Sequence, residues 1–104
     1  MITEIVRFDL PADMPRAKVI ELFKATVPRW QSNPDLIRKQ YLYDPEGAQG
    51  GGIYLWKTKA DALSAHDDAW CDMAESIYGS RPRFDYFETP LVVDNSIGEV
   101  LYTD

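Results

Sequence analysis

The sequence predicts a single α+β domain in which strands and helices follow one another in the order βαββαβ. The 104 residues are too few to bury two separate hydrophobic cores. Two segments carry apolar side chains at helical spacing, whereas four others are rich in strand-forming residues and are bounded by turn residues. Short connections between such elements predict an antiparallel sheet with both helices on one face.

The N-terminal part of the chain predicts a strand and an amphipathic helix. Residues 2–10 alternate in part between apolar and polar side chains and stop at Pro11, which indicates the first strand. Asp13 is in position to cap the helix that follows, and Pro28 is expected to end it. The apolar face of this helix repeats at Val19, Ile20, Phe23 and Val27.

The middle of the chain predicts two further strands joined by a turn. Residues 35–43 are rich in strand formers and lie between two turn sequences, 33–34 and 44–47. Neither face of this strand is cleanly polar, so we expect each face to meet something other than bulk water. The glycines at 50–52 lack the context of a phosphate-binding loop and indicate a hairpin with close backbone approach before the strand 53–56.

The C-terminal half predicts the second helix and the last strand. The helix is expected to begin at the capping box formed by residues 58–61 and to run toward Tyr78, with Gly79 placed to stop it. Residues 83–93 predict the last long strand, and Pro90 places its end at a sheet edge or a bulge. These elements complete the βαββαβ order.

Together the elements predict a ferredoxin-like fold for a domain that spans residues 1–96. The tail, residues 97–104, is expected to add a short strand at 100–102 or to form a dimer arm. Because both helices cover one face of the sheet, the other face would be bare. Packing it against the sheet of a second copy would remove exposed apolar area, so we expect a homodimer.

Composition argues against several classes of function. The net charge of -6 arises from 17 acidic and 11 basic residues without a basic cluster, so neither a nucleic acid nor an anionic membrane is expected as partner. Cys71 is the single cysteine and His66 the single histidine, so we expect no internal disulfide and no metal site. The sequence has no apolar run of about 18 residues and no secretion signal, and we expect a cytoplasmic protein.

A catalytic interpretation of the sequence depends on His66. A helical projection places it near the middle of the apolar arc of the second helix, with Trp70 one turn further along the same ridge. One interpretation is a core histidine that pairs with a buried carbonyl or tyrosine hydroxyl group. The other is the acid or base of a pocket between helix and sheet, a task that suits imidazole because its unperturbed pKa is about 6.5.

Other candidate residues admit both a structural and a functional interpretation. Arg38 can pair with an acidic group of a substrate or with a structural partner such as Asp85 or Glu88. Cys71, at the edge of the apolar arc, is expected to be a buried and inert thiol. Aromatic side chains suited to a pocket wall, to the core or to a dimer contact are Tyr41, Tyr43, Tyr54, Trp56 and Tyr86.

Several blocks of the sequence carry a family resemblance, namely residues 35–41, 51–56, 66–70, 86–88 and 90–95. Over residues 1–96 the chain resembles the YdhR-like monooxygenases, which belong to the dimeric α+β barrel superfamily. The resemblance implies a ferredoxin-like protomer, a barrel-forming dimer and a pocket between the sheet and the helices. Related members oxidise aromatic or polyketide-like compounds without metal or flavin, so the resemblance implies that no cofactor is needed.

The leading functional hypothesis is a cofactor-independent monooxygenase that acts on a small, flat, phenolic or enolisable molecule. In this hypothesis His66 helps to remove a proton from the substrate, and Arg38 stabilises the oxyanion charge that develops. The side chains expected to position the substrate ring are Trp70, Trp56, Tyr54 and Tyr86. One alternative is a noncatalytic dimeric module for ligand binding or stress response, and another is a lyase or isomerase that uses the same base without oxygen.

Overall fold

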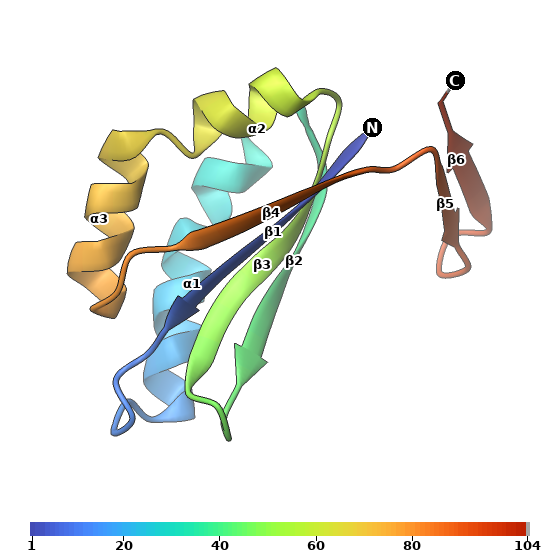
Figure 1. The fold of residues 1–104 in the computed structure, drawn as a ribbon. Coiled ribbons are helices and arrows are strands. Elements are labelled where there is room, and N and C mark those ends of the chain that lie inside the picture. The colour runs from blue at the N-terminus through green and yellow to red at the C-terminus, as the bar shows by residue number, and fades with distance from the viewer. Residues whose placement is uncertain (104) are drawn as a thin grey trace.

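A computed structural model describes residues 1–103 and contains a four-stranded antiparallel sheet covered by helices on one face (Figure 1). The strands are β1 (Ile2–Asp9), β2 (Leu36–Asp44), β3 (Gln49–Trp56) and β4 (Arg83–Glu88), in the spatial order β2-β3-β1-β4. The helices are α1 (Arg16–Gln31), α2 (Lys59–Ala65) and α3 (Asp68–Tyr78). This strand order is that of the ferredoxin-like fold, so the predicted fold class is confirmed.

The hydrophobic core lies between the helices and the helix-facing side of the sheet. Alternate residues of each strand point to this side, and in β1 they are the even-numbered positions, among them Val6 and Phe8. Aromatic rings fill most of the space, and the Trp30 and Trp56 indoles are both buried. Of the aromatic residues that the sequence left open between a pocket wall, the core and a dimer contact, Tyr54 and Trp56 thus lie in the core.

The first helix differs from its predicted limits at both ends. Its N-cap residue is Pro15, so the predicted cap at Asp13 is wrong, and the helix continues through Pro28 to its last turn. Pro28 costs one backbone hydrogen bond, but the added turn buries Trp30, and burying a large apolar side chain is worth about 2–3 kcal/mol. Neither α1 nor any other helix in residues 1–103 is long and apolar enough to cross a membrane.

The predicted second helix is in fact two helices that meet at His66. α2 ends with His66 outside the helical region (φ -108°, ψ 54°), and Asp67 caps α3 by accepting a 2.9 Å hydrogen bond from the backbone N–H of Trp70. An aspartate that caps a new helix competes with continuation of the old one, which explains the wrong prediction. The outer ends are confirmed, since Thr58 caps α2 and Gly79, with φ 90°, follows α3.

The hairpin formed by β2 and β3 contains a close backbone approach to β1 and a register shift. A Cβ atom on Gly51 would lie 1.9 Å from the carbonyl oxygen of Val6, so the close approach expected at the glycines is confirmed, although they lie within β3. In β2 the register shifts between Leu36 and Arg38. This shift places Lys39 on the helix-facing side of the sheet and Arg38 on the opposite side.

The predicted strand 83–93 is wrong in its length, because it is interrupted at Thr89 and Pro90. Thr89 donates its backbone N–H to the carbonyl oxygen of Met1 at 2.9 Å, and Pro90 has no N–H with which to continue the ladder. The chain leaves the four-stranded sheet at this point.

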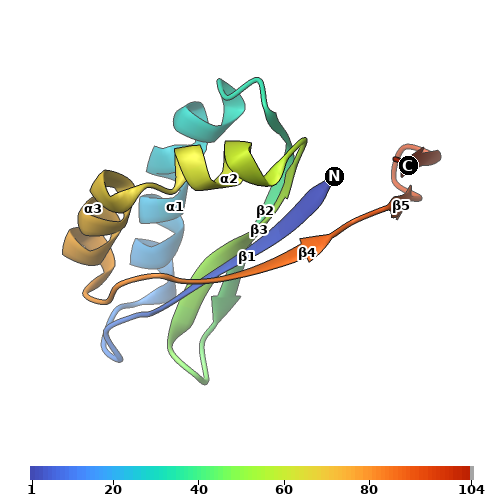
Figure 2. The ribbon, with the colours of Figure 1, turned by 45° about the horizontal axis from the view of Figure 1, so that its top comes forward.

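A separate hairpin follows, formed by β5 (Leu91–Asp94) and β6 (Glu99–Tyr102). It lies beyond the face of the main sheet that carries no helix (Figure 1, Figure 2). The short strand expected at 100–102 is present as part of β6, and Asp104, the last residue of the expected tail, lies outside the described residues.

Candidate functional site

A row of four side chains with polar groups crosses the sheet from edge to edge. Glu4 on β1 pairs with Tyr54 on β3 and with Tyr86 on β4, and Tyr54 pairs in turn with Lys39 on β2. Residues directly opposite one another in an antiparallel sheet point to the same face. All four side chains therefore project toward the helices, and an acid and a base lie on either side of Tyr54.

Glu4 is entirely buried, and its carboxylate is the polar centre of the core. Trp56 donates its indole N–H to Glu4 Oε1 at 2.9 Å, and His66 Nδ1 lies 2.7 Å from the same oxygen. The His66 contact is close but lacks the alignment of a hydrogen bond, and Glu4 Oε2 has no partner among residues 1–103. A carboxylate removed from water is costly unless it is paired, so His66 and Trp56 offset the cost of burying Glu4.

Apart from its contact with Glu4, His66 is packed against aromatic rings. The centroid of its imidazole lies 4.3 Å from that of Trp70, 4.6 Å from Tyr54 and 5.1 Å from Trp30. Its side chain has no exposed surface, and its Nε2 atom has no partner among the described residues. The structure therefore presents His66 as an internally paired core residue, and no open space reaches the imidazole.

Lys39 presents the opposite situation, because its amine is enclosed by rings but unpartnered. Lys39 Nζ lies 3.8 Å from the ring centroid of Tyr41, 4.5 Å from that of Tyr54 and 4.6 Å from that of Trp30. Within residues 1–103 it forms no hydrogen bond and no ion pair. Burial lowers the pKa of Lys39 to about 7, although the negative charge of Glu4 opposes this shift. Near neutral pH a large fraction of this amine is therefore unprotonated.

Two spaces meet at Lys39. An inner cavity of about 30 Å³, enough for one or two water molecules, lies between α1, α3 and the sheet. An outer groove of about 350 Å³ runs along the C-terminal part of α1 and the start of β2, with Val27 and Leu36 among its lining residues. Trp30, Lys39 and Tyr41 line both spaces, so these three side chains form the wall between them.

The phenol groups around the inner cavity keep their protons at neutral pH. Burial raises the pKa of Tyr78 to about 12, and it raises that of Tyr54 well above its ordinary value. Outside the cavity, burial and then the Glu4 charge raise the pKa of Tyr86. The Tyr41 hydroxyl lies 2.6 Å from that of Thr26, which holds the ring against Lys39. The cavity thus offers hydroxyl donors rather than phenolates.

The structure brings together most of the candidate residues that the sequence identified. Tyr54, Trp56 and Trp70 surround His66, and Tyr86 adjoins the same cluster through Glu4. The question of whether Tyr54 and Trp56 face the core or a partner is answered, since both are buried under the helices.

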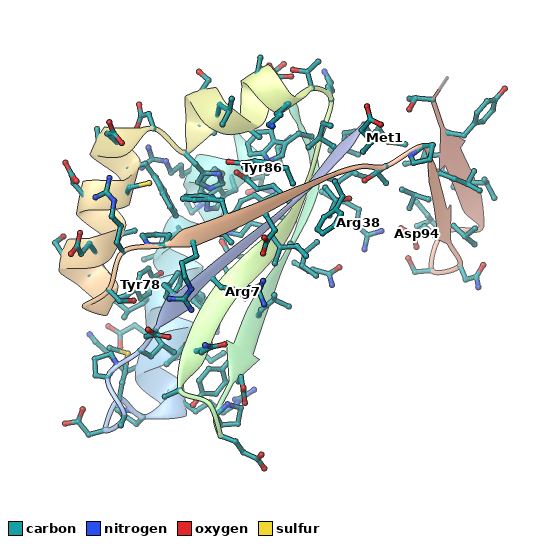
Figure 3. All side chains as sticks on the ribbon, in the orientation of Figure 1. Met1, Arg7, Arg38, Tyr78, Tyr86 and Asp94 are labelled. Carbon is teal, nitrogen blue, oxygen red and sulfur yellow. The ribbon has the colours of Figure 1, made fainter. Side chains whose placement is uncertain are left out.

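Arg38 is not part of this cluster. It lies on the opposite face of the sheet, where its guanidinium donates to Asp94 Oδ2 at 2.9 Å, and Figure 3 shows the two side chains directed toward one another. Its structural partner is thus in the hairpin, whereas Asp85, suggested from the sequence, pairs with Arg7. Cys71 is buried and burial raises its thiol pKa, as expected for an inert cysteine.

Sequence reasoning missed Glu4, Lys39 and Trp30. Glu4 occupies the apolar side of the first strand, between Ile2 and Val6, and a polar residue in such a position was a usable signal. The mixed faces noted for residues 35–43 were the corresponding signal for Lys39. Among residues 1–103 no three His, Cys, Asp or Glu side chains gather in a way that could hold a metal ion.

Comparison with known proteins gives matches to solved structures alone. No family model matches the sequence, and no curated protein matches it. SnoaB, a cofactor-independent oxygenase from Streptomyces nogalater, is 16% identical, with a TM-score of 0.62 over 85% of this chain and 91% of that one. The monooxygenase from the gene ActVA-Orf6 of Streptomyces coelicolor, in complex with Nanaomycin D, is 14% identical, with a TM-score of 0.63 over 85% of this chain and 86% of that one.

A protein of unknown function from Nitrosomonas europaea is 15% identical, with a TM-score of 0.67 over 85% of this chain and 87% of that one. The matching structures include an antibiotic biosynthesis monooxygenase, and these similarities show that the chain has the same fold. The finer likeness to the YdhR-like proteins stays a prediction.

Proposed function

We propose that this protein is a cofactor-independent monooxygenase of small, flat phenolic or enolisable compounds, with its site at Lys39 on the helix side of the sheet. The observation that carries the proposal is an amine with a pKa of about 7, without a partner among the described residues, in the wall between an open groove and a ring-lined cavity. A base with a pKa near the working pH is the group that proton abstraction requires. The fold shared with known oxygenases supports the same reaction class.

The reaction needs a substrate that can itself supply the electrons for dioxygen. The neutral amine of Lys39 accepts the proton of the substrate hydroxyl or enol, and the resulting anion donates electrons to dioxygen. For a phenol with a free para position, one oxygen atom of dioxygen becomes the new carbonyl oxygen. The other leaves as water with the two hydrogens that the phenol loses. The products are therefore a quinone and one water molecule.

Lys39 would have two roles in this reaction, first as the base and then as a cation. Once protonated, it is an ammonium group beside the oxyanion that its own proton transfer created, and electrostatic stabilisation of such charge is a large contribution to catalysis. The three surrounding rings stabilise the ammonium form through cation–π contacts. Glu4 acts in the same direction, because its charge raises the pKa of Lys39 against the effect of burial.

His66 has a different place in this proposal from the one that the sequence suggested. Since the imidazole is enclosed and paired with Glu4, it positions the carboxylate and does not contact the substrate. Trp30 and Tyr41 line the outer groove beside Lys39 and would contact the substrate ring, whereas Tyr54 and Trp70 line the small inner cavity behind them. Trp56 holds Glu4 through its indole N–H. In this proposal Lys39 is the base, and Glu4, which His66 and Trp56 contact, raises the pKa of Lys39 from a separate position.

A noncatalytic ligand-binding module is the second candidate, and two observations favour it. The inner cavity has room for only one or two waters, and His66 is enclosed in close contact with Glu4, away from any substrate. A protein whose own rings fill its pocket can hold a ligand in the outer groove without chemistry. Ligand binding without turnover is the outcome that distinguishes this candidate from an oxygenase.

Oxygen consumption in the presence of a panel of naphthols and hydroxyanthracenones tests the proposal. We expect wild-type protein to consume one dioxygen per quinone formed, and Lys39→Met to lose most of this activity. Turnover that persists unchanged under nitrogen would indicate a lyase or isomerase instead. Thermal stabilisation by panel compounds without any product would indicate the binding module.

We also propose that the protein is a homodimer in which the helix-free faces of two sheets meet. The proposal is supported by exposed apolar side chains on this face and on the adjoining hairpin, which include Phe87, Leu91, Val93, Val100 and Tyr102. Such a concentration of exposed apolar surface is typical of an interaction site. The measured mass of the protein in solution tests this point.

A further inference from the structure

We propose that Lys39 is also a covalent capture site, whose amine forms an imine with flat, conjugated aldehydes that enter through the outer groove. This inference goes beyond the proposed oxygenase activity, since it needs no dioxygen and no acidic substrate. It concerns the amine as a nucleophile rather than as a base.

The position of the amine is the first argument. The chain contains five lysines, and Lys18, Lys24, Lys57 and Lys59 are exposed to solvent, whereas Lys39 is largely enclosed. Its Nζ atom lies among three rings and meets no acceptor within residues 1–103. A lysine nucleophile in proteins is activated by such desolvation, because the neutral form then persists near neutral pH.

Access is the second argument. The outer groove of about 350 Å³ is wide enough for a one- or two-ring aldehyde, and its lining includes apolar side chains such as Val27 and Leu36. Trp30 and Tyr41 lie in the same wall as Lys39, so a flat molecule can stack on these rings with its carbonyl group toward the amine. The site therefore favours conjugated, planar aldehydes over branched aliphatic ones.

The chemistry balances without an additional reactant. The nitrogen lone pair attacks the carbonyl carbon and gives a carbinolamine; its hydroxyl group then leaves as water, and the C=N bond forms as the nitrogen loses its proton. The departing hydroxyl needs a proton donor, and the half-buried Tyr41 and the buried Tyr54, whose phenol pKa values are both raised by burial, can supply the proton.

Reductive trapping tests the inference directly. Wild-type protein is incubated with cinnamaldehyde or salicylaldehyde at pH 7.5, the imine is reduced with cyanoborohydride, and the adducts are located by peptide mass mapping. We expect Lys39 to be labelled at least about tenfold faster than any exposed lysine, since far more of its amine is neutral at this pH. Lys39→Met should lose this fast adduct, and Lys59→Met, an exposed control, should keep it.

Lys39→Arg separates the amine from its charge, because it retains a cation in the ring cage but cannot form the imine. Circular dichroism and thermal melting confirm that each variant is folded. Labelling that is spread over the exposed lysines, with Lys39 no faster than the others, would overturn the inference. Fast labelling of Lys39 in a protein that consumes no oxygen would leave it standing while the oxygenase proposal fails.

Discussion

The carboxylate of Glu4 and the imidazole of His66 face each other inside the domain, with 2.7 Å between Oε1 and Nδ1. One comes from the first strand and the other from the junction between two helices, so the contact ties the sheet to the helical layer. Neither side chain has any exposed surface. A close pair of this kind is expected to matter mainly for stability, because removing one partner leaves the other buried and uncompensated.

Glu4→Gln is therefore expected to lower the free energy of unfolding by about 3 kcal/mol, the usual cost of breaking a buried pair. Urea denaturation measures this change. His66→Gln should cost a similar amount, and the double variant should cost at least about 1 kcal/mol less than the sum of the two, because the residues interact directly. Strictly additive losses would show that the two side chains do not form an energetic pair.

The identity of the base is tested by comparing two single variants below their melting temperatures. Lys39→Met is expected to lower kcat/KM by about 10²-fold, the usual size of a general-base contribution. It should remain at least as stable as wild type, because an apolar side chain replaces an amine that is costly to bury. His66→Gln should lose stability but keep most of the activity of its folded fraction. The reverse pattern would assign the base to His66, as the sequence first suggested.

Stability should depend on pH through Lys39. The pKa of Lys39 is about 7 in the folded protein, against an ordinary value of 10.5 in the unfolded chain. Between these two values the unfolded state binds more protons than the folded state, so the free energy of unfolding rises as the pH rises from about 7 to 10. Urea titrations at several pH values measure this slope. Lys39→Met should flatten it, and an equal slope in the variant would mean that another group is responsible.

The order of the helices and strands could be predicted because the residues that begin and end them act locally, and they have the same role in the folded protein. Thr58 and Gly79 bound a helical segment through their own hydrogen-bonding and backbone preferences, and the structure confirms both. The break at His66 was missed because Asp67 fits equally well on a helix surface and at a cap. In the folded protein Trp70 is buried and its backbone N–H donates to Asp67, so Asp67 acts as the cap.

The candidate site was harder to predict, because it depends on which face each strand residue occupies. A single register shift between Leu36 and Arg38 turns Lys39 toward the helices and Arg38 away from them. Such a shift cannot be predicted from the sequence of a strand without a polar face, because the alternation of apolar and polar residues that would reveal it is missing. Glu4 was overlooked for a related reason, since a buried carboxylate makes sense only once its partner His66, distant in sequence, is known.

The Arg38–Asp94 contact is expected to hold the β5–β6 hairpin near the main sheet rather than to support chemistry. Because Arg38 is well exposed, Arg38→Ala should change the free energy of unfolding by no more than about 1 kcal/mol. Hydrogen exchange of the hairpin amides should speed up, while the exchange of β1 should not change. A tenfold loss of turnover without any change in the hairpin would contradict this and return Arg38 to the active site.

The proposed dimer is tested with a pair of matched charge substitutions. Phe87 is exposed on the face of the sheet that carries no helix, whereas Leu63 is similarly exposed on α2. Burying a charged side chain in an apolar contact is strongly unfavourable, so Phe87→Asp should dissociate the dimer while Leu63→Asp leaves it intact. Light scattering coupled to size-exclusion chromatography should give twice the 11.9 kDa of one chain for wild type and Leu63→Asp, and a single chain for Phe87→Asp. A wild-type protein that runs as a monomer at micromolar concentration would rule out a stable dimer, and dissociation by Leu63→Asp would move the contact to the helical layer.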